Sequence, residues 1–391
     1  MTYQQEVFLP AWEKLEPTLR HWGDTDHDGL LHGPIVCLTV VWHHDELTFY
    51  MNDWHNIHWV HKGEGAIPYA KGEGVSLMVA DFVSTDYGWL CTPNGSQQVR
   101  VLFKVGKPQE GYFMNEDILR QGMNAMDILQ RHYPSENHVF VFDNATTHLK
   151  QVDNALSTCK MPKNTPRHGR NWGVADAVLD GDGKPVFDPN GKARHQTVRM
   201  GDATFVDGGP QCLYFREDHL VSPGIFKGMA IILEERGYSA SNLWVECKGF
   251  KCSKNATSCC CWRMLYNEPD FSEVESLLET TCKARGFQVL FLPKFHCELN
   301  FIEQCWGYSK RIYRQYSISS KEVDLERNVL KALESVPLAS MCRFATRSRC
   351  FMGGYQQGLN GKQATWAAKK YGGHRVIPET IMEEIELALV D

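Results

Sequence analysis

The stretch Phe291-Leu-Pro-Lys-Phe-His-Cys-Glu-Leu-Asn-Phe-Ile-Glu-Gln-Cys-Trp-Gly-Tyr-Ser-Lys-Arg311 decides how the rest of the chain is interpreted. An apolar run with strand character, 287–292, ends at Pro293, and the pattern predicts that a helix begins near Asn300. Asn300 is a good N-cap, and Glu303 follows three residues later, as in a capping box. Taken alone, Glu303 is explained equally well as a capping residue or as a functional acid.

Two upstream stretches also place an acid at the end of an apolar strand. They are Val139-Phe-Val-Phe-Asp143-Asn-Ala-Thr-Thr-His148 and Val40-Val-Trp-His-His-Asp45-Glu46. Three acids from three separate elements can meet at one edge of a sheet. Carboxylates are the ligands that Mg²⁺ and Mn²⁺ prefer, and two such ions about 3.5–4 Å apart support phosphodiester chemistry. Asp45, Asp143 and Glu303 are therefore the candidate catalytic residues and metal ligands of a two-metal site.

Neighbouring residues leave alternatives open. Asp81 also ends an apolar strand and competes with Asp45 as first acid, but we expect it on a neighbouring strand, satisfied by a backbone N–H. His148 lies one helical turn beyond Asp143, where it would orient that acid, bind a phosphate or face solvent. Asn144 is expected to hold the turn after Asp143.

The three stretches resemble the catalytic motifs of the mariner superfamily of DDE transposases, in particular the fungal members with a long insertion that bears cysteines. His44-Asp45-Glu46-Leu-Thr-Phe resembles the first motif, Asp143-Asn-Ala-Thr-Thr-His148 the second, and Leu299-Asn-Phe-Ile-Glu303-Gln-Cys-Trp-Gly307 the third. The likeness to the fungal members extends over nearly the whole chain. It implies an RNase H-like fold and metal-dependent cleavage and joining of DNA strands at transposon ends.

The resemblance also implies partners and a location. We expect DNA, as transposon ends and target, bound with the help of His148, Lys310 and Arg311, a homodimer within a synaptic complex, and a nuclear location. The chain departs from the family pattern in three ways. Some 160 residues separate the second and third acids, Phe301 stands where many relatives have Pro, and the helix-turn-helix domains that precede such cores are expected to be absent.

The periodicities predict an α/β fold, a mixed sheet with flanking helices, a long insertion before the last core strand and a helical C-terminal region. We expect strands at 35–42, 49–51 (its hairpin partner), 72–82, 98–105 and 139–142, and helices at 114–133, 224–236 and 273–285. The predicted segments are a lead-in (1–34), the first part of the core (35–148), the insertion (149–282), the last strand with the catalytic helix (283–316) and a basic helical region (317–391).

Charge and hydropathy narrow the class of protein. The 391 residues carry a net charge of −6, which argues against a surface that is basic throughout. From 305 to 375, however, thirteen Lys and Arg face four acids, so this segment is either a DNA-backbone-binding surface or a basic helical surface without a partner. No apolar run approaches the roughly 18 residues of a membrane span, and the first residues lack the pattern of a signal peptide.

Fourteen cysteines raise the question of metal binding. Five crowd into one segment, at 247, 252, 259, 260 and 261, and in a reducing compartment this pattern favours a structural Zn²⁺. We expect Cys247, Cys252, Cys259 and Cys261 as ligands, with at least one of the three adjacent cysteines spare. Cys282, or His296 and Cys297, are alternative completions of the site.

Three tryptophans have two possible roles. Trp54, Trp59 and Trp89 either stack on unpaired bases or pack in the core, and core packing is favoured.

The leading function is a transposase or integrase-type catalytic core. The alternatives are a domesticated or decayed protein that binds nucleic acid without transposing, and an RNase H-like nuclease of another purpose.

Overall fold

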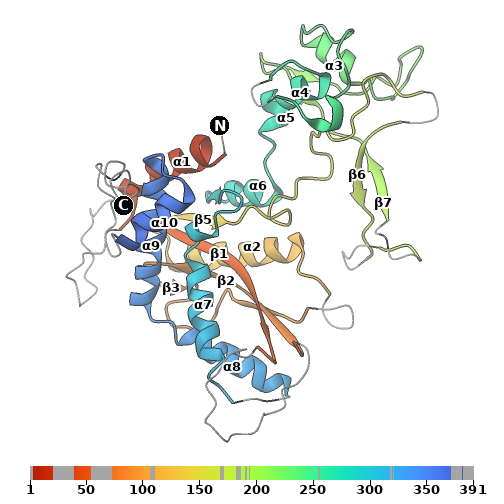
Figure 1. The fold of residues 1–391 in the computed structure, drawn as a ribbon. Helices are drawn as coiled ribbons and strands as arrows, with labels where there is room; N and C mark the ends of the chain where they lie inside the picture. Colours follow the sequence, from red (N-terminus) through yellow and green to blue (C-terminus); the bar gives the residue numbers. More distant parts are fainter. Residues whose placement is uncertain are drawn as a thin grey trace, which may run out of the picture. The chain divides into compact units, whose positions relative to one another are not determined.

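The chain has two compact units (Figure 1). A computed structural model describes residues 3–20, 39–53, 73–105, 111–167, 171–181, 186–189, 192, 194–253, 256–317, 319, 321–370 and 381. The core unit comprises Met1–Lys150 and Leu278–Asp391, and the insertion unit comprises Gln151–Leu277. The insertion thus precedes the last strand of the core, as predicted. Within the described part of the chain, no helix combines the length and apolar character needed to cross a membrane.

A mixed sheet of six strands organises the described part of the core unit. Its strands are β1 (Thr39–Tyr50), β2 (Ser76–Ser84), β3 (Gly88–Trp89), β4 (Val101–Phe103), β5 (Asn137–Phe142) and β10 (Gln288–Phe291). The order is β10-β5-β1-β2-β3, with β4 also paired to β2. Strand β1 is antiparallel to β2 and parallel to β5, which is in turn parallel to β10. This is the predicted RNase H-like arrangement.

The predicted hairpin between 35–42 and 49–51 was wrong. Residues 39–50 form the single strand β1, while 35–38 lie outside the described residues. The polar pair Asp45-Glu46 was expected to end the strand. In the structure it continues the strand, with Asp45 opposite Asp81 and Glu46 opposite Ala80 of β2. The hairpin partner of β1 is therefore β2.

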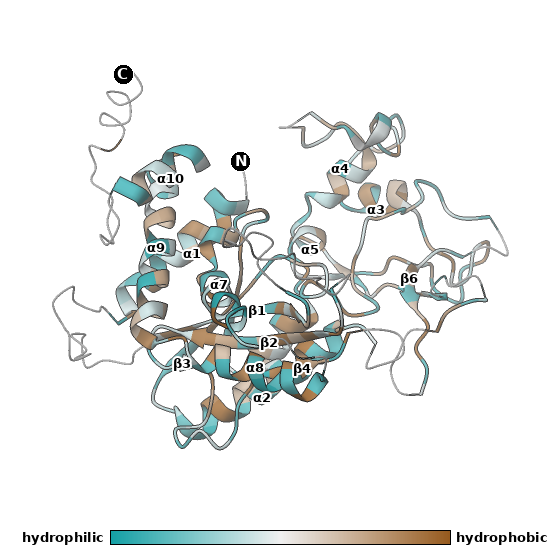
Figure 2. Ribbon diagram, turned by 60° about the horizontal axis from the view of Figure 1, so that its bottom comes forward, coloured by the Kyte–Doolittle hydropathy of each residue, from teal (hydrophilic) through white to brown (hydrophobic). Residues whose placement is uncertain are grey.

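Side chains alternate between the two faces of the sheet, and each face has its own helices. Trp42, Phe82 and Phe140 lie on one face and pack against α2 (Asn115–His132) and α6 (Leu277–Ala284). Val41, Val79 and other odd-numbered positions lie on the other face. They pack against α1 (Leu9–Leu15), α7 (Ile302–Tyr313), α8 (Glu322–Glu334), α9 (Leu338–Gln356) and α10 (Gly361–Lys370). Figure 2 shows the hydrophobic colour along the strands between these helices.

The C-terminal region is helical, as predicted. The helix α9 continues through the adjacent residues Gly353 and Gly354 to Gln356. Gly354 is buried, and the cluster around it includes Phe351, Tyr355 and residues of α10. Gly354 is thus part of a buried helix face, where tertiary packing outweighs the low helix propensity of glycine.

The insertion unit contains short elements in its described residues. They are the pairs β6 (Val174–Ala177) with β7 (His195–Val198) and β8 (Ala203–Thr204) with β9 (Pro210–Gln211), and the helices α3 (Met229–Glu235), α4 (Cys261–Tyr266) and α5 (Pro269–Ser272). One hydrophobic cluster holds them, with Phe226, Ile232 and Leu265 at its centre. The predicted helices 224–236 and 273–285 are shorter in the structure, as α3 and α6.

Candidate active site

Asp45, Asp143 and Glu303 line one cavity of about 490 Å³ in the core unit. Asp45 lies within β1, Asp143 directly follows β5, and Glu303 lies in the first turn of α7. The parallel register pairs His43 with Val141, so that Asp45 and Asp143 continue two neighbouring strands on the face that α7 covers. The sheet and one helix thus bring together the three acids singled out in the sequence.

Asn300 fixes the start of α7 against β1, a role different from the expected N-cap. Its side-chain Oδ1 lies 3.0 Å from His43 Nδ1, and its Nδ2 donates to the His44 carbonyl at 3.3 Å. The N–H of Asn300 bonds the Cys297 carbonyl, and the N-cap position is taken by Phe301. The capping-box explanation of Glu303 therefore does not hold.

Phe301 also contacts β1. Its ring lies 4.7 Å from the His43 ring in an edge-on arrangement, and the side chain is buried. A proline at this position would fix the backbone φ at the start of the helix, and phenylalanine does not. The Phe301 ring instead packs against His43 beside Asn300. With Phe301 at this position, Glu303 lies in the first turn of the helix.

The acids of the cavity repel one another, although Asp45 and Asp143 are only partly buried and Glu303 is exposed. Burial raises the pKa of Asp45 well above its usual range, and the Glu303 and Glu46 carboxylates raise it further. The pKa of Glu303 is raised by burial and by the charge of Asp143. Trp306 Nε1 donates a hydrogen bond to Asp45 Oδ2 at 3.0 Å, which orients this carboxylate without neutralising it. A cation placed among these acids would remove the repulsion.

His148 lies between two carboxylates and is buried. Its Nδ1 contacts the Asp143 carboxylate, and its Nε2 lies 3.2 Å from Glu46 Oε1. Burial opposes the charged ring, but hydrogen bonds to Asp143 and Glu46 outweigh it and raise the pKa of His148 to about 10. Burial would raise the pKa of Asp143, yet the hydrogen bond with His148 lowers it overall. The solvent-facing alternative for His148 was therefore wrong, and its contacts fit the role of orienting Asp143.

Glu46, Trp306 and Asn300 were quoted in the sequence motifs without these roles. Strand alternation places Glu46 on the opposite face from Asp45, and this signal was available in the sequence. The side-chain partners of Trp306 and Asn300 on β1 are more than 250 residues away, so only the fold reveals them.

Two sets of side chains in the core unit could bind a metal ion: the three cavity acids, and His44 with Glu46 and His148. The ligand atoms of His44, Glu46 and His148 all lie within 4.8 Å of one another. The charged state of His148 and its contact with Glu46 disfavour a cation there. Among the described residues, the three cavity acids do not form a group of this closeness, and a two-metal site does not require it, because each ion needs only two of the three acids.

The predicted DNA-binding residues Lys310 and Arg311 lie further along α7, outside the cavity lining. Lys310 Nζ is 3.7 Å from Asp53 Oδ2, and the Arg311 guanidinium lies 4.8 Å from the Tyr308 ring centre.

Lys294 and Phe295 do line the cavity, which the sequence did not suggest. The Phe295 side chain is fully exposed on a backbone with φ +67°. A bulky residue rarely adopts this conformation, and such strain often accompanies function.

Asp81 is a structural acid. It faces Asp45 across β1 and β2, but Arg100 Nε lies 2.6 Å from its Oδ2, and the Phe82 N–H donates to its Oδ1 at 2.8 Å. Asp81 was expected on a strand next to that of Asp45 with a backbone N–H as partner, and both expectations agree with the structure.

Trp89 packs on Trp306 with ring centres 5.1 Å apart, so the core prediction for Trp89 was right. Trp54 and Trp59 lie outside the described residues.

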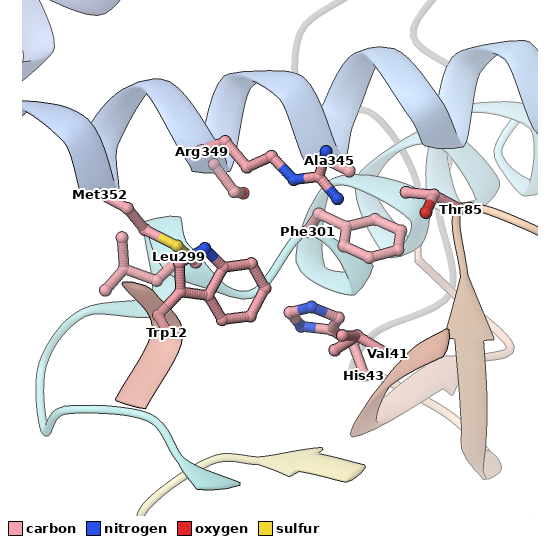
Figure 3. Close-up of a pocket in the computed structure, with 10 residues that line it drawn as sticks. Trp12, Val41, His43, Thr85, Leu299, Phe301, Ala345, Arg349 and Met352 are labelled. Atoms are coloured by element: carbon pink, nitrogen blue, oxygen red, sulfur yellow. The ribbon is translucent and has the colours of Figure 1, made fainter. Parts of the chain in front are cut away.

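A second cavity lies on the same face of the sheet and is much smaller (Figure 3). Trp12, His43, Phe301 and Arg349 are among its lining residues, and its volume is about 20 Å³. That is room for roughly one water molecule. Burial lowers the pKa of His43 to about 4, so its ring is neutral beside Asn300. The second cavity is therefore a packing feature, and the larger one remains the candidate site.

No model of a protein family matches the chain, and no curated protein matches it. Several solved structures do. The chain is similar to a Mos1 transposase paired-end complex with left transposon end, at 21% identity over 28% of this chain and 29% of that chain, with a TM-score of 0.21. It is also similar to a mariner Mos1 paired end complex with Mg (20%, covering 28% and 30%, TM-score 0.22) and to the Mos1 strand transfer complex (18%, covering 37% and 33%, TM-score 0.23). The chain thus matches about a third of the length of these proteins.

Proposed function

We propose that this chain is the catalytic core of a DDE transposase of the mariner type, which cleaves and joins DNA strands with divalent metal ions. One observation carries the proposal. Asp45, Asp143 and Glu303 come from three elements and line one cavity on one face of an RNase H-like sheet, where burial and neighbouring acids raise the pKa of Asp45 and of Glu303. The motif resemblance names the same three residues.

The cavity fits Mg²⁺ or Mn²⁺ because its three acids offer hard oxygen ligands and excess negative charge. Asp45, Asp143 and Glu303 would hold the ions. When bound, two such ions polarise the scissile phosphate and favour ionisation of the attacking hydroxyl. The protein's contribution is to keep the three carboxylates on rigid elements and in the right protonation state.

Three neighbouring groups support that task. His148 keeps Asp143 ionised and fixes its orientation from the side of Glu46. Trp306 orients Asp45 through its indole N–H, and Asn300 holds the start of α7 on β1. These contacts restrict the carboxylates before a substrate arrives, which is the preorganisation that metal-dependent catalysis needs.

DNA is the proposed partner. At the mouth of the cavity, Lys294 would contact a phosphate, and the exposed Phe295 ring would stack on an unpaired base near the cleavage point. Lys310, Arg311 and the basic helices α9 and α10 would bind the phosphate backbone beyond it. A homodimer that holds two DNA ends, and a nuclear location, complete the proposal.

The test is a plasmid-nicking assay with the purified full chain and Mg²⁺ or Mn²⁺. We expect metal-dependent nicking that falls to background in Asp45→Asn, Asp143→Asn and Glu303→Gln. The matched control is Glu326→Gln, which neutralises an exposed acid on α8. Nicking that is equal in all variants would overturn the proposed site. DNA binding without nicking by the unaltered chain would instead support the decayed, nucleic-acid-binding alternative.

A further inference from the structure

Four cysteines of the insertion unit come together in space. The sulfurs of Cys247, Cys252, Cys259 and Cys260 all lie within 4.8 Å of one another, and Cys252 Sγ is 3.9 Å from Cys260 Sγ. Four thiolates around one tetrahedral Zn²⁺, with Zn–S near 2.3 Å, place their sulfurs about 3.7–3.8 Å apart. We infer that these four cysteines bind one structural Zn²⁺ in the insertion unit.

The ligand set differs from the sequence prediction at one position, because Cys260 takes the place of Cys261. Cys260 is extended and precedes α4, whereas Cys261 begins the helix, so that the two side chains diverge. The Cys261 sulfur lies 4.0 Å from the Ala240 carbonyl and belongs to the hydrophobic cluster of the unit. Cys261 is the spare residue of the three adjacent cysteines.

The alternative completions of the site were wrong as well. Cys282 is buried in the core unit, in the cluster that contains Phe140 and Phe287. His296 and Cys297 line the cavity of Asp45, Asp143 and Glu303. The four clustered cysteines come from the insertion unit alone, so a metal bound there needs no ligand from the core unit.

The chemistry of four sulfurs selects the ion. A disulfide joins only two sulfurs, at about 2.05 Å, and the four cysteines of the cluster are free thiols. Thiolates favour Zn²⁺ or iron over Mg²⁺. An iron–sulfur cluster would place its own irons and sulfides between the cysteines and spread them further apart. One tetrahedral ion matches the observed spacing.

The backbone around the cluster suits thiolate ligands. Cys260 Sγ accepts a hydrogen bond from the Arg263 N–H at 3.4 Å, and such N–H···S contacts stabilise the ionised sulfur. Between the first two cysteines, Gly249 has φ +63°, which turns the chain so that Cys252 returns to Cys247. A Cβ at Gly249 would meet no neighbouring atom, so backbone conformation is what favours glycine there.

The position of the cluster explains what the ion does. The Cys261 and Trp262 N–H groups bond the carbonyls of Trp244 and Val245, both at 3.0 Å. A metal bound to Cys247 and Cys260 would close this loop onto α4 and the cluster around Leu265. A unit with strands of two to four residues gains most from such a link, because its own core supplies little burial.

The experiment measures metal in the purified full chain and in a matched pair of variants. We expect one Zn²⁺ per chain by elemental analysis, and Co²⁺ substitution should give the intense sulfur-to-cobalt charge-transfer bands of a tetrahedral four-thiolate site. Cys260→Ser should lose most of the zinc, while Cys261→Ser and the exposed-cysteine control Cys212→Ser should keep it.

Three outcomes would overturn the inference: iron in place of zinc, a cobalt spectrum without thiolate bands, or zinc lost from Cys261→Ser but kept by Cys260→Ser. If Cys260→Ser is not recovered in folded form, the cobalt spectrum of the unaltered chain together with Cys261→Ser decides. None of these measurements depends on DNA cleavage, so the zinc inference and the proposed function fail or stand separately.

Discussion

The core unit and the insertion unit each gather metal-ligand side chains in one place, but they reach that arrangement in opposite ways. In the core unit, Asp45 lies on β1, Asp143 directly follows β5, and both strands pack between helices, one of which carries Glu303. In the insertion unit, the four cysteines lie on irregular chain and at the start of a six-residue helix.

The difference shows which comes first, the fold or the metal. Buried side chains such as Trp42, Phe82 and Phe140 stabilise the core sheet without any ion. Ionised Asp45 lowers the stability of the fold, and the apolar packing compensates for this. The insertion unit has a single described hydrophobic cluster, and its thiols are placed where a metal would close the chain. A metal in the core would serve chemistry, and a metal in the insertion would serve the fold.

The largest expected effect comes from chelation. A strong zinc chelator should abolish hydrogen-exchange protection in the insertion unit from Met200 to Leu265, while β1 and β5 of the core keep theirs. Structural Zn²⁺ contributes about 10–16 kcal/mol in zinc-finger peptides, more than a small core can replace. Zn²⁺ should restore protection and Mg²⁺ should not. Protection that survives complete metal removal, or loss that spreads to the core sheet, would break the comparison.

The same contrast explains how much of the fold was readable from sequence. Val139 to Phe142 form the continuous apolar run typical of a strand buried on both faces. Met114 to Tyr133 show helix periodicity, because α2 buries one face. The acids within β1 hid its continuity, since Asp45 and Glu46 have low strand propensity and are kept there by the fold. In the insertion unit, weak periodicity left only the cysteine spacing as a signal.

For the candidate site, the three acids were predictable and their supporting contacts were not. Asp143 follows a strand, Glu303 lies in the first turn of a helix, and Asp45 follows the apolar first half of β1, so each acid has a recognisable local pattern. The bonds from Asn300 to β1 and from Trp306 to Asp45 join residues far apart in the chain. The choice of Cys260 over Cys261 depends on one backbone conformation before α4, which spacing alone does not define.

The next effect concerns the positioning of Asp143. His148→Gln removes the positive ring between Asp143 and Glu46, and we expect Mn²⁺ affinity of the core to fall about 10- to 100-fold, the usual cost of losing such a supporting contact. Calorimetric titration of Mn²⁺ into the zinc-loaded chain measures it. Nicking should recover in part at high Mn²⁺ concentration.

His138→Gln is the matched control for that variant. His138 is also buried at the sheet, but its partners are Trp42 and the Tyr133 carbonyl, with no carboxylate among them. It should lower stability without shifting the Mn²⁺ titration. Equal shifts in both variants would mean that His148 acts only through packing, and zinc content should stay unchanged in either case.

The smallest expected effect is a change in stability that has opposite signs in the two units. Replacing a metal-ligand acid should stabilise the core unit, whereas replacing a metal-ligand cysteine should destabilise the insertion unit. The folded-state pKa of Asp45 is raised, first by burial and then by Glu303, so ionising Asp45 costs folding free energy. We therefore expect Asp45→Asn to be more stable to urea than the unaltered chain at neutral pH, in zinc-containing buffer without Mg²⁺ or Mn²⁺. The asparagine oxygen can still accept the Trp306 hydrogen bond.

The pH dependence of that gain follows from the raised pKa. Protonated Asp45 contributes stability that is fully present below its ordinary pKa of 3.8 and is lost as pH rises through the raised value. Asparagine stays neutral at every pH, so the two proteins should be equally stable near pH 3.8 and separate as pH rises. Urea unfolding of the core at several pH values measures this. A less stable Asp45→Asn at neutral pH would show that the carboxylate is a favourable structural partner, and then the acids of the core would no longer differ in kind from the cysteines of the insertion.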